Sequence, residues 1–288
     1  YSSRVNCIHC GSIKEVIKLM SSSIQVHVLH TGSVIVDEAL PFNYKSNPPF
    51  AWTGLFRSKK KQMRLPVSIY LIEHPKGLVL IDTGWHAINR TKPFKNLSLA
   101  YPIYKADLPE GEAVHEHIEQ LGYQVSDLDY VVLSHLHCDH ADGLRHVSTA
   151  NHILVSQEEL DAANHNTIGY EPHQWENINI DTFAFTHNGI GPTGKSFDLF
   201  DDGTIEFVHT PGHSIGQCAA RIKAHKDDDA FLLLASDAAY ASKSWNYGIL
   251  PGLVNNKEET INSLNWIKSQ ATHPQCIQVL ANHDPDIK

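Results

Sequence analysis

SHLHCDHADG, residues 134 to 143, is the stretch from which the fold can be worked out. It places His135, His137, Asp139 and His140 within six residues, directly after residues 129–134, an apolar run typical of a buried strand. Ionisable groups at such a strand end are costly unless they are paired or bound to a metal. A tight loop can aim the first two histidines to one side and turn the other two residues toward a second point nearby. Because zinc accepts imidazole nitrogen and carboxylate oxygen at about 2.0–2.2 Å, we predict a metal site here.

Two ions would need about six or seven ligands, so more must come from elsewhere in the chain. Three single residues fit because each follows a predicted strand. His213 comes shortly after the strand that ends at His209, and Asp237 ends the most apolar strand. His283 follows the last strand. Ligands at successive strand ends on one edge of a sandwich would form a compact site, so we predict that these three residues complete it.

Runs with the pattern of strands cluster in each half of the chain, and helical spacing occurs between them. The predicted strands are residues 24–29, 33–36, 67–73, 77–82, 129–134, 152–155, 204–209, 217–222, 230–235 and 275–280. The predicted helices are residues 15–20, 112–121, 157–164 and 257–270, and residues 41–64 are predicted to be a long loop rich in aromatic side chains. This order favours the α+β class, with sheets sandwiched between outer helices.

The domain organisation follows from the lack of any evident linker or low-complexity tract. Residues 24–288 are predicted to form a single domain, and the polar residues 1–23 an N-terminal extension. The extension contains Cys7 and Cys10, which we interpret as bystanders because no second CxxC pair or redox fold accompanies them.

Composition excludes several classes of function. A formal charge of −9 argues against a nucleic-acid partner, and no apolar run reaches the ~20 residues of a membrane span. The five cysteines are scattered and do not form a disulfide framework. We therefore expect a cytoplasmic protein, with the periplasm as the alternative if a signal peptide has been removed.

The ligand pattern resembles that of the metallo-β-lactamase superfamily. The shared features are HxHxDH, a later histidine after a Thr-Pro-Gly turn, a strand-end aspartate and a final histidine, together with the turn Asp82-Thr83-Gly84. The resemblance implies an αβ/βα sandwich of two mostly antiparallel sheets flanked by helices, with two metal ions. It implies that one ion is held by His135, His137 and His213, that the other is held by Asp139, His140 and His283, and that Asp237 bridges them.

Within the superfamily the sequence is most similar to N-acyl-homoserine lactonases. The segment HTPGHSIGQ, residues 209–217, and a tyrosine three residues after Asp237 carry this likeness. It implies that Tyr240 helps to hold the substrate carbonyl. Two bridged metals would lower the pKa of a shared water to about 7, and the hydroxide would open the lactone ring while Asp139 delivers a proton to the leaving oxygen.

An acylated lactone also needs an apolar groove beside the metals. The candidates are aromatic residues near the predicted strand ends, namely Trp52, Phe56, Trp85 and Trp245.

Several alternatives stay open at this stage. The same ligands would suit a thioester, phosphoester or phosphotriester hydrolase, a di-iron redox protein, or a binding module that has lost catalysis. Zinc is the expected metal, but imidazole and carboxylate ligands also accept iron, cobalt or manganese. The expected partner is a small acylated lactone, and a homodimer is compatible with the sequence.

Overall fold

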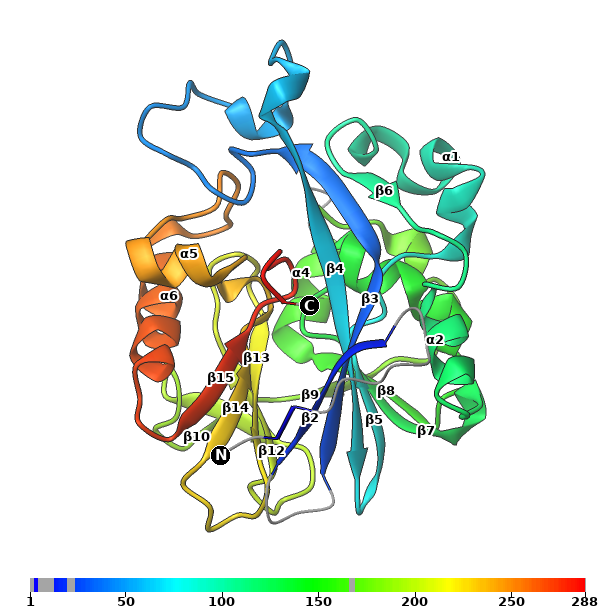
Figure 1. The fold of residues 1–288 in the computed structure, drawn as a ribbon, viewed down its shortest axis with the longest axis vertical. Coiled ribbons are helices and arrows are strands. Elements are labelled where there is room, and N and C mark those ends of the chain that lie inside the picture. The colour runs from blue at the N-terminus through cyan, green and yellow to red at the C-terminus, as the bar shows by residue number, and fades with distance from the viewer. Residues whose placement is uncertain (1–2, 5–12, 20–23, 166–168, 288) are drawn as a thin grey trace.

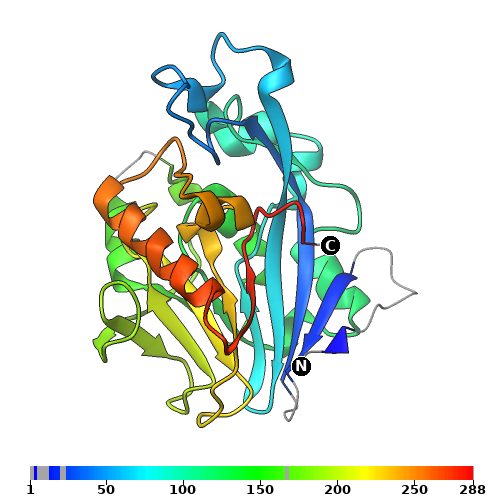
Figure 2. The ribbon, with the colours of Figure 1, turned by 60° about the vertical axis from the view of Figure 1, so that its left-hand side comes forward.

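A computed structural model describes residues 3–4, 13–19, 24–165 and 169–287 of the chain. Two β-sheets pack face to face, and helices lie against their outer faces (Figure 1, and Figure 2 after a 60° turn). Both sheets are mixed, with antiparallel pairs in the majority. The α+β sandwich predicted from the sequence is therefore confirmed.

The first sheet has the strand order β1-β2-β3-β4-β5-β7-β8-β9, with β6 also paired to β3. Its strands are β1 (Ser3–Arg4), β2 (Ile13–Lys18), β3 (Gln25–Asp37), β4 (Gln62–His74), β5 (Gly77–Ile81), β6 (Lys105–Asp107), β7 (Leu128–Val132), β8 (His152–Ser156) and β9 (Asp181–Phe183). The second sheet has the order β10-β11-β12-β13-β14-β15. Its strands are β10 (Thr186–His187), β11 (Lys195–Asp198), β12 (Ile205–His209), β13 (Cys218–Lys223), β14 (Phe231–Leu234) and β15 (Cys276–Leu280).

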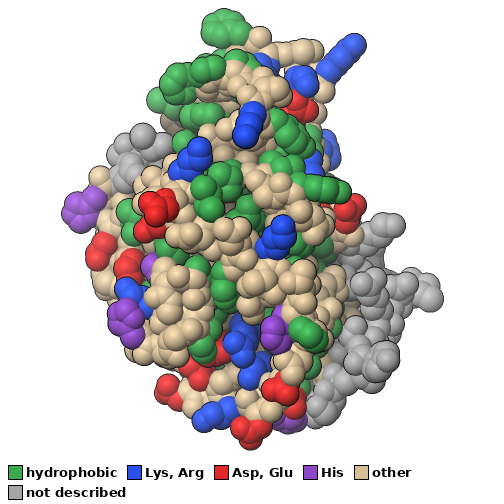
Figure 3. Space-filling view, turned by 90° about the vertical axis from the view of Figure 1, so that its left-hand side faces the viewer, with side chains coloured by type: hydrophobic (Ala, Val, Ile, Leu, Met, Phe, Trp, Pro, Cys, Tyr) green, Lys and Arg blue, Asp and Glu red, His purple; other side chains and the backbone are tan. Residues whose placement is uncertain are grey.

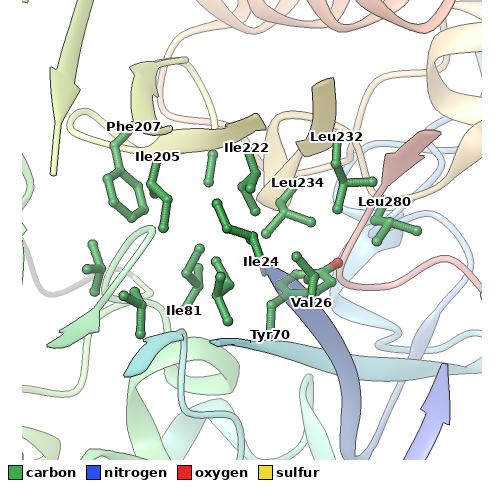
Figure 4. Packing of buried hydrophobic residues seen from close by; sticks show 14 of the residues in the cluster. Ile24, Val26, Tyr70, Ile81, Ile205, Phe207, Ile222, Leu232, Leu234 and Leu280 are labelled. Carbon is green, nitrogen blue, oxygen red and sulfur yellow. The ribbon is translucent and has the colours of Figure 1, made fainter. Parts of the chain in front are cut away.

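The facing surfaces of the two sheets enclose the main core. Side chains on the inner face of the first sheet contact those on the inner face of the second (Figure 4). The first set includes Ile24, Val26, Tyr70 and Ile81, and the second includes Ile205, Phe207, Ile222, Leu232, Leu234 and Leu280. All of these side chains are nearly inaccessible to solvent. Such burial is the main source of stability for a sandwich of this kind, at roughly 25 cal/mol per Å² of apolar surface.

The helices are α1 (Pro93–Leu97), α2 (Val114–Gln120), α3 (Cys138–Ala141), α4 (Gln157–His165), α5 (Ser242–Tyr247) and α6 (Lys257–Ala271). Helix α2 covers the outer face of the first sheet with Val114 and Ile118. Helix α6 covers the outer face of the second sheet with Leu264 and Ile267. Its start is fixed by Asn256, whose side chain accepts hydrogen bonds from the first-turn backbone. None of the described helices has the length and apolar character needed to cross a membrane.

Most predicted strands and helices are present, but one is wrong. The helix predicted over residues 15–20 is strand β2, which pairs antiparallel with β3 and buries Ile17. Cross-strand pairing along the long β3 thus outweighs the local helical spacing. Within residues 1–23, predicted as an extension, β2 therefore belongs to the first sheet, whereas Cys7 and Cys10 lie outside the described residues. The predicted strands 24–29 and 33–36 form one strand, β3.

Candidate metal centre

The predicted ligands meet at one edge of the sandwich because each follows a strand. The HxHxDH segment follows β7 and runs into the short helix α3, while His213 follows β12. Asp237 follows β14, and His283 follows the neighbouring parallel strand β15. Their ligand atoms form three overlapping groups, each within 4.8 Å: His135 with His137 and His213, His135 with His140 and Asp237, and Asp139 with His140 and His283.

Asp237 lies between the two sides of this cluster. Its Oδ2 is 3.4 Å from Nε2 of His213, and its Oδ1 is 3.4 Å from Nε2 of His140 and 3.3 Å from Nε2 of His283. Oδ2 of Asp139 is 3.4 Å from the same His283 nitrogen. The two oxygens of Asp237 therefore face different histidines, which is the arrangement that a bridging carboxylate requires.

A shell of buried hydrogen bonds orients the histidine rings. Nδ1 of His140 lies 2.9 Å from Oδ2 of Asp82, and Nδ1 of His283 lies 2.8 Å from the carbonyl of Pro66. Nδ1 of His135 lies 3.1 Å from the hydroxyl of Ser134. Holding Nδ1 in this way leaves Nε2 directed at the centre, as is usual for histidines that bind metals.

Nδ1 of His137 and Nε2 of His213 lie 2.8 Å apart, within hydrogen-bond distance of each other, whereas several other atoms directed at the centre form no hydrogen bond among the described residues. Nε2 of His135, His140 and His283 and Oδ1 of Asp237 are buried and form no hydrogen bond, although Oδ1 of Asp237 lies within ion-pair distance of the nitrogens of His140 and His283. Buried polar atoms are almost always paired, so each of these needs an explanation. A divalent metal ion supplies one, since imidazole nitrogen and carboxylate oxygen are its usual donors. The residues present therefore fit a metal centre.

Burial and the neighbouring carboxylates pull the histidine pKa values in opposite directions. Burial lowers the pKa of His137 to about 4 and that of His213 to about 3. For His140 and His283, burial also lowers the pKa, but the charge of Asp237 together with other nearby carboxylates outweighs it and raises the pKa above the ordinary value. Neutral imidazole is the form that binds a metal. Burial alone would raise the pKa of the Asp237 carboxyl, but His283 and His140 hold it well below its ordinary value, so it stays ionised.

Two loops that carry ligands are tied together by Glu159 of α4, which is completely buried. Its Oε1 accepts a hydrogen bond from the backbone N–H of Leu136 at 3.0 Å. Its Oε2 accepts from the hydroxyl of Ser214 at 2.8 Å and from the N–H of Gly216 at 2.9 Å. Any side chain at Gly216 would collide with the backbone of Glu159, because a Cβ there would lie 2.2 Å from its nitrogen. Sequence reasoning missed Glu159, since nothing in the sequence marks a lone helical glutamate as buried.

A cavity of about 200 Å³ opens onto the ligands. At one end it is lined by His137, Asp139, His213, Asp237 and Tyr240. Its apolar wall consists of side chains from β3, β4 and three loops, namely Val34, Val36, Leu40, Trp52, Leu65, Leu99, Ala100, Ile103 and Leu253. The remaining lining residues are Tyr104, Cys138, Gly169 and Glu171. The arrangement can hold a molecule with one polar end at the ligands and one apolar end against the wall.

Tyr240 lines this cavity beside the metal ligands. Its ring stacks on that of His283, with 5.2 Å between the ring centroids. Burial, with the charges of Asp237 and Asp139, raises the pKa of its phenol well above the ordinary value. Tyr240 therefore stays protonated and can donate a hydrogen bond into the cavity.

Only one of the four aromatic residues predicted for substrate binding lines this cavity, Trp52. Trp85 is fully buried, and its indole N–H donates to the carbonyl of Ser33, so it is a core residue. Trp245 is buried against α6 and the second sheet. Phe56 is 108% exposed, on the loop that projects above the sandwich. Figure 3 shows hydrophobic side chains gathered at this end of the molecule. An aromatic side chain near a strand end can enter the core, the surface or a cavity, and spacing alone does not distinguish them.

The fold and the ligand set together define a metal-dependent hydrolase scaffold, and the chain belongs to the metallo-beta-lactamase superfamily. The profile of that superfamily matches residues 63–251.

Within this superfamily, several known proteins are similar to the chain. The chain is 30% identical over 275 residues to the N-acyl homoserine lactonase AttM of Azorhizobium caulinodans, covering 92% of this chain and 95% of the relative. It is 28% identical over 228 residues to the AttM lactonase of Agrobacterium fabrum, covering 77% and 83%. A 1.4 Å structure of an N-acyl homoserine lactone hydrolase, which holds the product N-hexanoyl-L-homoserine at its catalytic metal centre, superposes with a TM-score of 0.73. That match covers 93% of this chain and 95% of the other at 21% identity, and so supports the fold.

Proposed function

We propose that this protein hydrolyses the lactone ring of N-acyl-homoserine lactones and so inactivates them as signals. One observation carries the proposal: a single cavity joins the metal ligands and a protonated Tyr240 to an apolar wall. A lactone that bears an acyl chain has the same division into a polar and an apolar end. The two related AttM lactonases support this choice of substrate.

We propose two zinc ions as the cofactor. His135, His137 and His213 would hold one, Asp139, His140 and His283 the other, and Asp237 would bridge them. When bound, two such ions supply Lewis acidity and lower the pKa of a shared water toward neutrality.

The residues of the chain then have separate tasks. Tyr240 donates a hydrogen bond to the lactone carbonyl oxygen as negative charge develops on it. The water oxygen bonds to the carbonyl carbon, and the ring C–O bond breaks. Asp139 accepts the water's proton and passes it to the departing ring oxygen. The products are an alcohol and a carboxylate on one molecule, with release of one proton.

The proposal also includes the domain organisation of the chain and its cellular compartment. Residues 24–288 would act as one catalytic domain, with the earlier residues as an N-terminal extension of which β1 and β2 join the first sheet. The scattered cysteines favour the cytoplasm.

Acid release from N-hexanoyl-homoserine lactone by the zinc-loaded protein tests the proposal. The Asp237→Ala variant is the control, because it removes the bridging carboxylate. We expect turnover by the wild type, and in the variant a loss of at least a hundredfold in kcat together with less bound zinc by elemental analysis. A wild-type protein that holds two zinc ions and leaves the lactone intact would contradict the proposal and direct attention to thioesters and phosphoesters.

A further inference from the structure

Tyr104 is a second tyrosine in the cavity, and the reaction proposed above does not use it. It precedes β6, in a turn where its N–H donates to the carbonyl of Ala100 at 2.9 Å. Its side chain lines the cavity together with Asp139, Asp237 and Tyr240.

The phenol of Tyr104 stays protonated. Burial, with the nearby Cys138 thiol and the carboxylates of Asp139 and Asp237, raises its pKa far above the ordinary value of 10. The same neighbours show that it is close to the ligand end of the cavity. A phenol in this form offers one O–H donor.

The two tyrosines are neighbours in the cavity, but they pack against different side chains. Tyr240 packs against the ligands His283 and His213, with ring centroids 5.2 and 5.7 Å away. Tyr104 instead packs against the apolar cluster that contains Val34, Val36 and Leu65, all of which belong to the apolar wall of the cavity. Tyr104 therefore lies at the junction between the ligand end and the apolar wall.

An N-acyl-homoserine lactone has its amide at the corresponding junction, between the lactone ring and the acyl chain. An amide carbonyl that leaves water needs a hydrogen-bond donor. Among the described lining residues, Glu171 offers only acceptors when ionised, and Cys138 is a weak donor. Trp52 also carries an N–H donor, and it lies beside Gly252, in the segment that follows α5.

We propose that Tyr104 donates a hydrogen bond to the amide carbonyl of the substrate and so selects N-acyl lactones over plain alkyl lactones. This inference rests on the proposed lactonase function. Tyr104 is thus a substrate-binding residue, whereas Tyr240 acts on the carbonyl that is attacked. The two tyrosines divide recognition and chemistry between them.

The test compares two substrates. N-decanoyl-homoserine lactone contains the amide, and γ-dodecalactone has an alkyl chain on a lactone ring without one. The Tyr104→Phe variant removes only the hydroxyl. Tyr101→Phe is the matched control, since Tyr101 lies in the same segment, packs edge-on against Phe94 and does not line the cavity.

For Tyr104→Phe we expect kcat/KM to fall about 3- to 10-fold on the N-acyl lactone, mainly through KM, because one neutral hydrogen bond is lost. The γ-lactone should be hydrolysed at an unchanged rate, and Tyr101→Phe should match the wild type on both substrates. Calorimetric titration with the ring-opened N-decanoyl-homoserine should show the same loss of affinity. Equal losses on both substrates, or no loss on either, would overturn the assignment. A wild type inactive on both lactones would instead overturn the proposed function itself.

Discussion

The two ends of the cavity are held in place in different ways. At the ligand end, buried side chains follow four strands of the two sheets, and hydrogen bonds to acceptor oxygens of Asp82, Glu159 and Pro66 hold this end in place. The apolar wall combines β3 and β4 with loop residues such as Trp52 and Leu253, which make van der Waals contacts alone. Directional bonds demand specific residues, whereas apolar packing accepts many side chains of similar volume. The ligand end should therefore tolerate little change, and the wall should set which acyl chain fits.

Metal removal should have the largest effect on activity and stability, because every residue of the ligand end depends on the metal. Chelation leaves a buried cluster of unpaired donors, so we expect activity to be lost and the thermal unfolding midpoint to fall. A metal present at 100 times its Kd stabilises the folded state by about 2.7 kcal/mol. Differential scanning calorimetry before chelation, after it and after zinc is restored measures this. An unchanged midpoint would mean that the ligand end is not coupled to folding.

The Glu159→Gln variant should have the second-largest effect, on zinc affinity. The amide keeps the shape of the side chain, but its NH2 group cannot accept, so it cannot serve both the N–H of Leu136 on one side and the donors of Ser214 and Gly216 on the other. By analogy with other residues that orient metal ligands, zinc affinity should fall about 10- to 100-fold. Competition with a fluorescent chelator measures this affinity. Glu158→Gln is the control, since that neighbour makes no side-chain hydrogen bond to either ligand loop among the described residues. Equal affinity in the two variants would sink the idea.

Trp52→Ala tests the wall. The loss of buried apolar area should lower kcat/KM about 10-fold for N-decanoyl-homoserine lactone and much less for the N-butanoyl substrate. Zinc content should stay the same. If kcat/KM fell equally for both chain lengths, Trp52 would not contribute to binding of the acyl chain.

The smallest effect is expected from Phe56→Ser. This side chain is fully exposed and does not line the cavity, so kcat/KM should stay within about twofold for every chain length, and stability within about 0.5 kcal/mol. Steady-state kinetics over a series of acyl lactones provides the measurement. A chain-length-dependent loss would instead extend the wall to the projecting loop.

The same contrast explains how far the sequence could be interpreted. The ligands were predictable because ionisable residues such as His135 and Asp237 follow apolar strands, and few physical reasons other than a metal can account for that. The wall was not predictable, because burial decides whether Trp52 or Trp85 faces a cavity, and burial depends on tertiary packing. Glu159 and Tyr104 were missed for the same reason. Strand β2 was mistaken for a helix because its pairing with β3 is not visible locally.

The hydrogen bond between Asn282 and Asp82 joins residues 200 positions apart. Asp82 also holds His140, and Asn282 precedes His283, so the centre closes only when distant parts of the chain have met. Contacts of such long sequence separation form slowly during folding. We therefore expect metal capture to be a late event in refolding, following collapse of the two sheets, and metal release to report on global rather than local opening of the molecule.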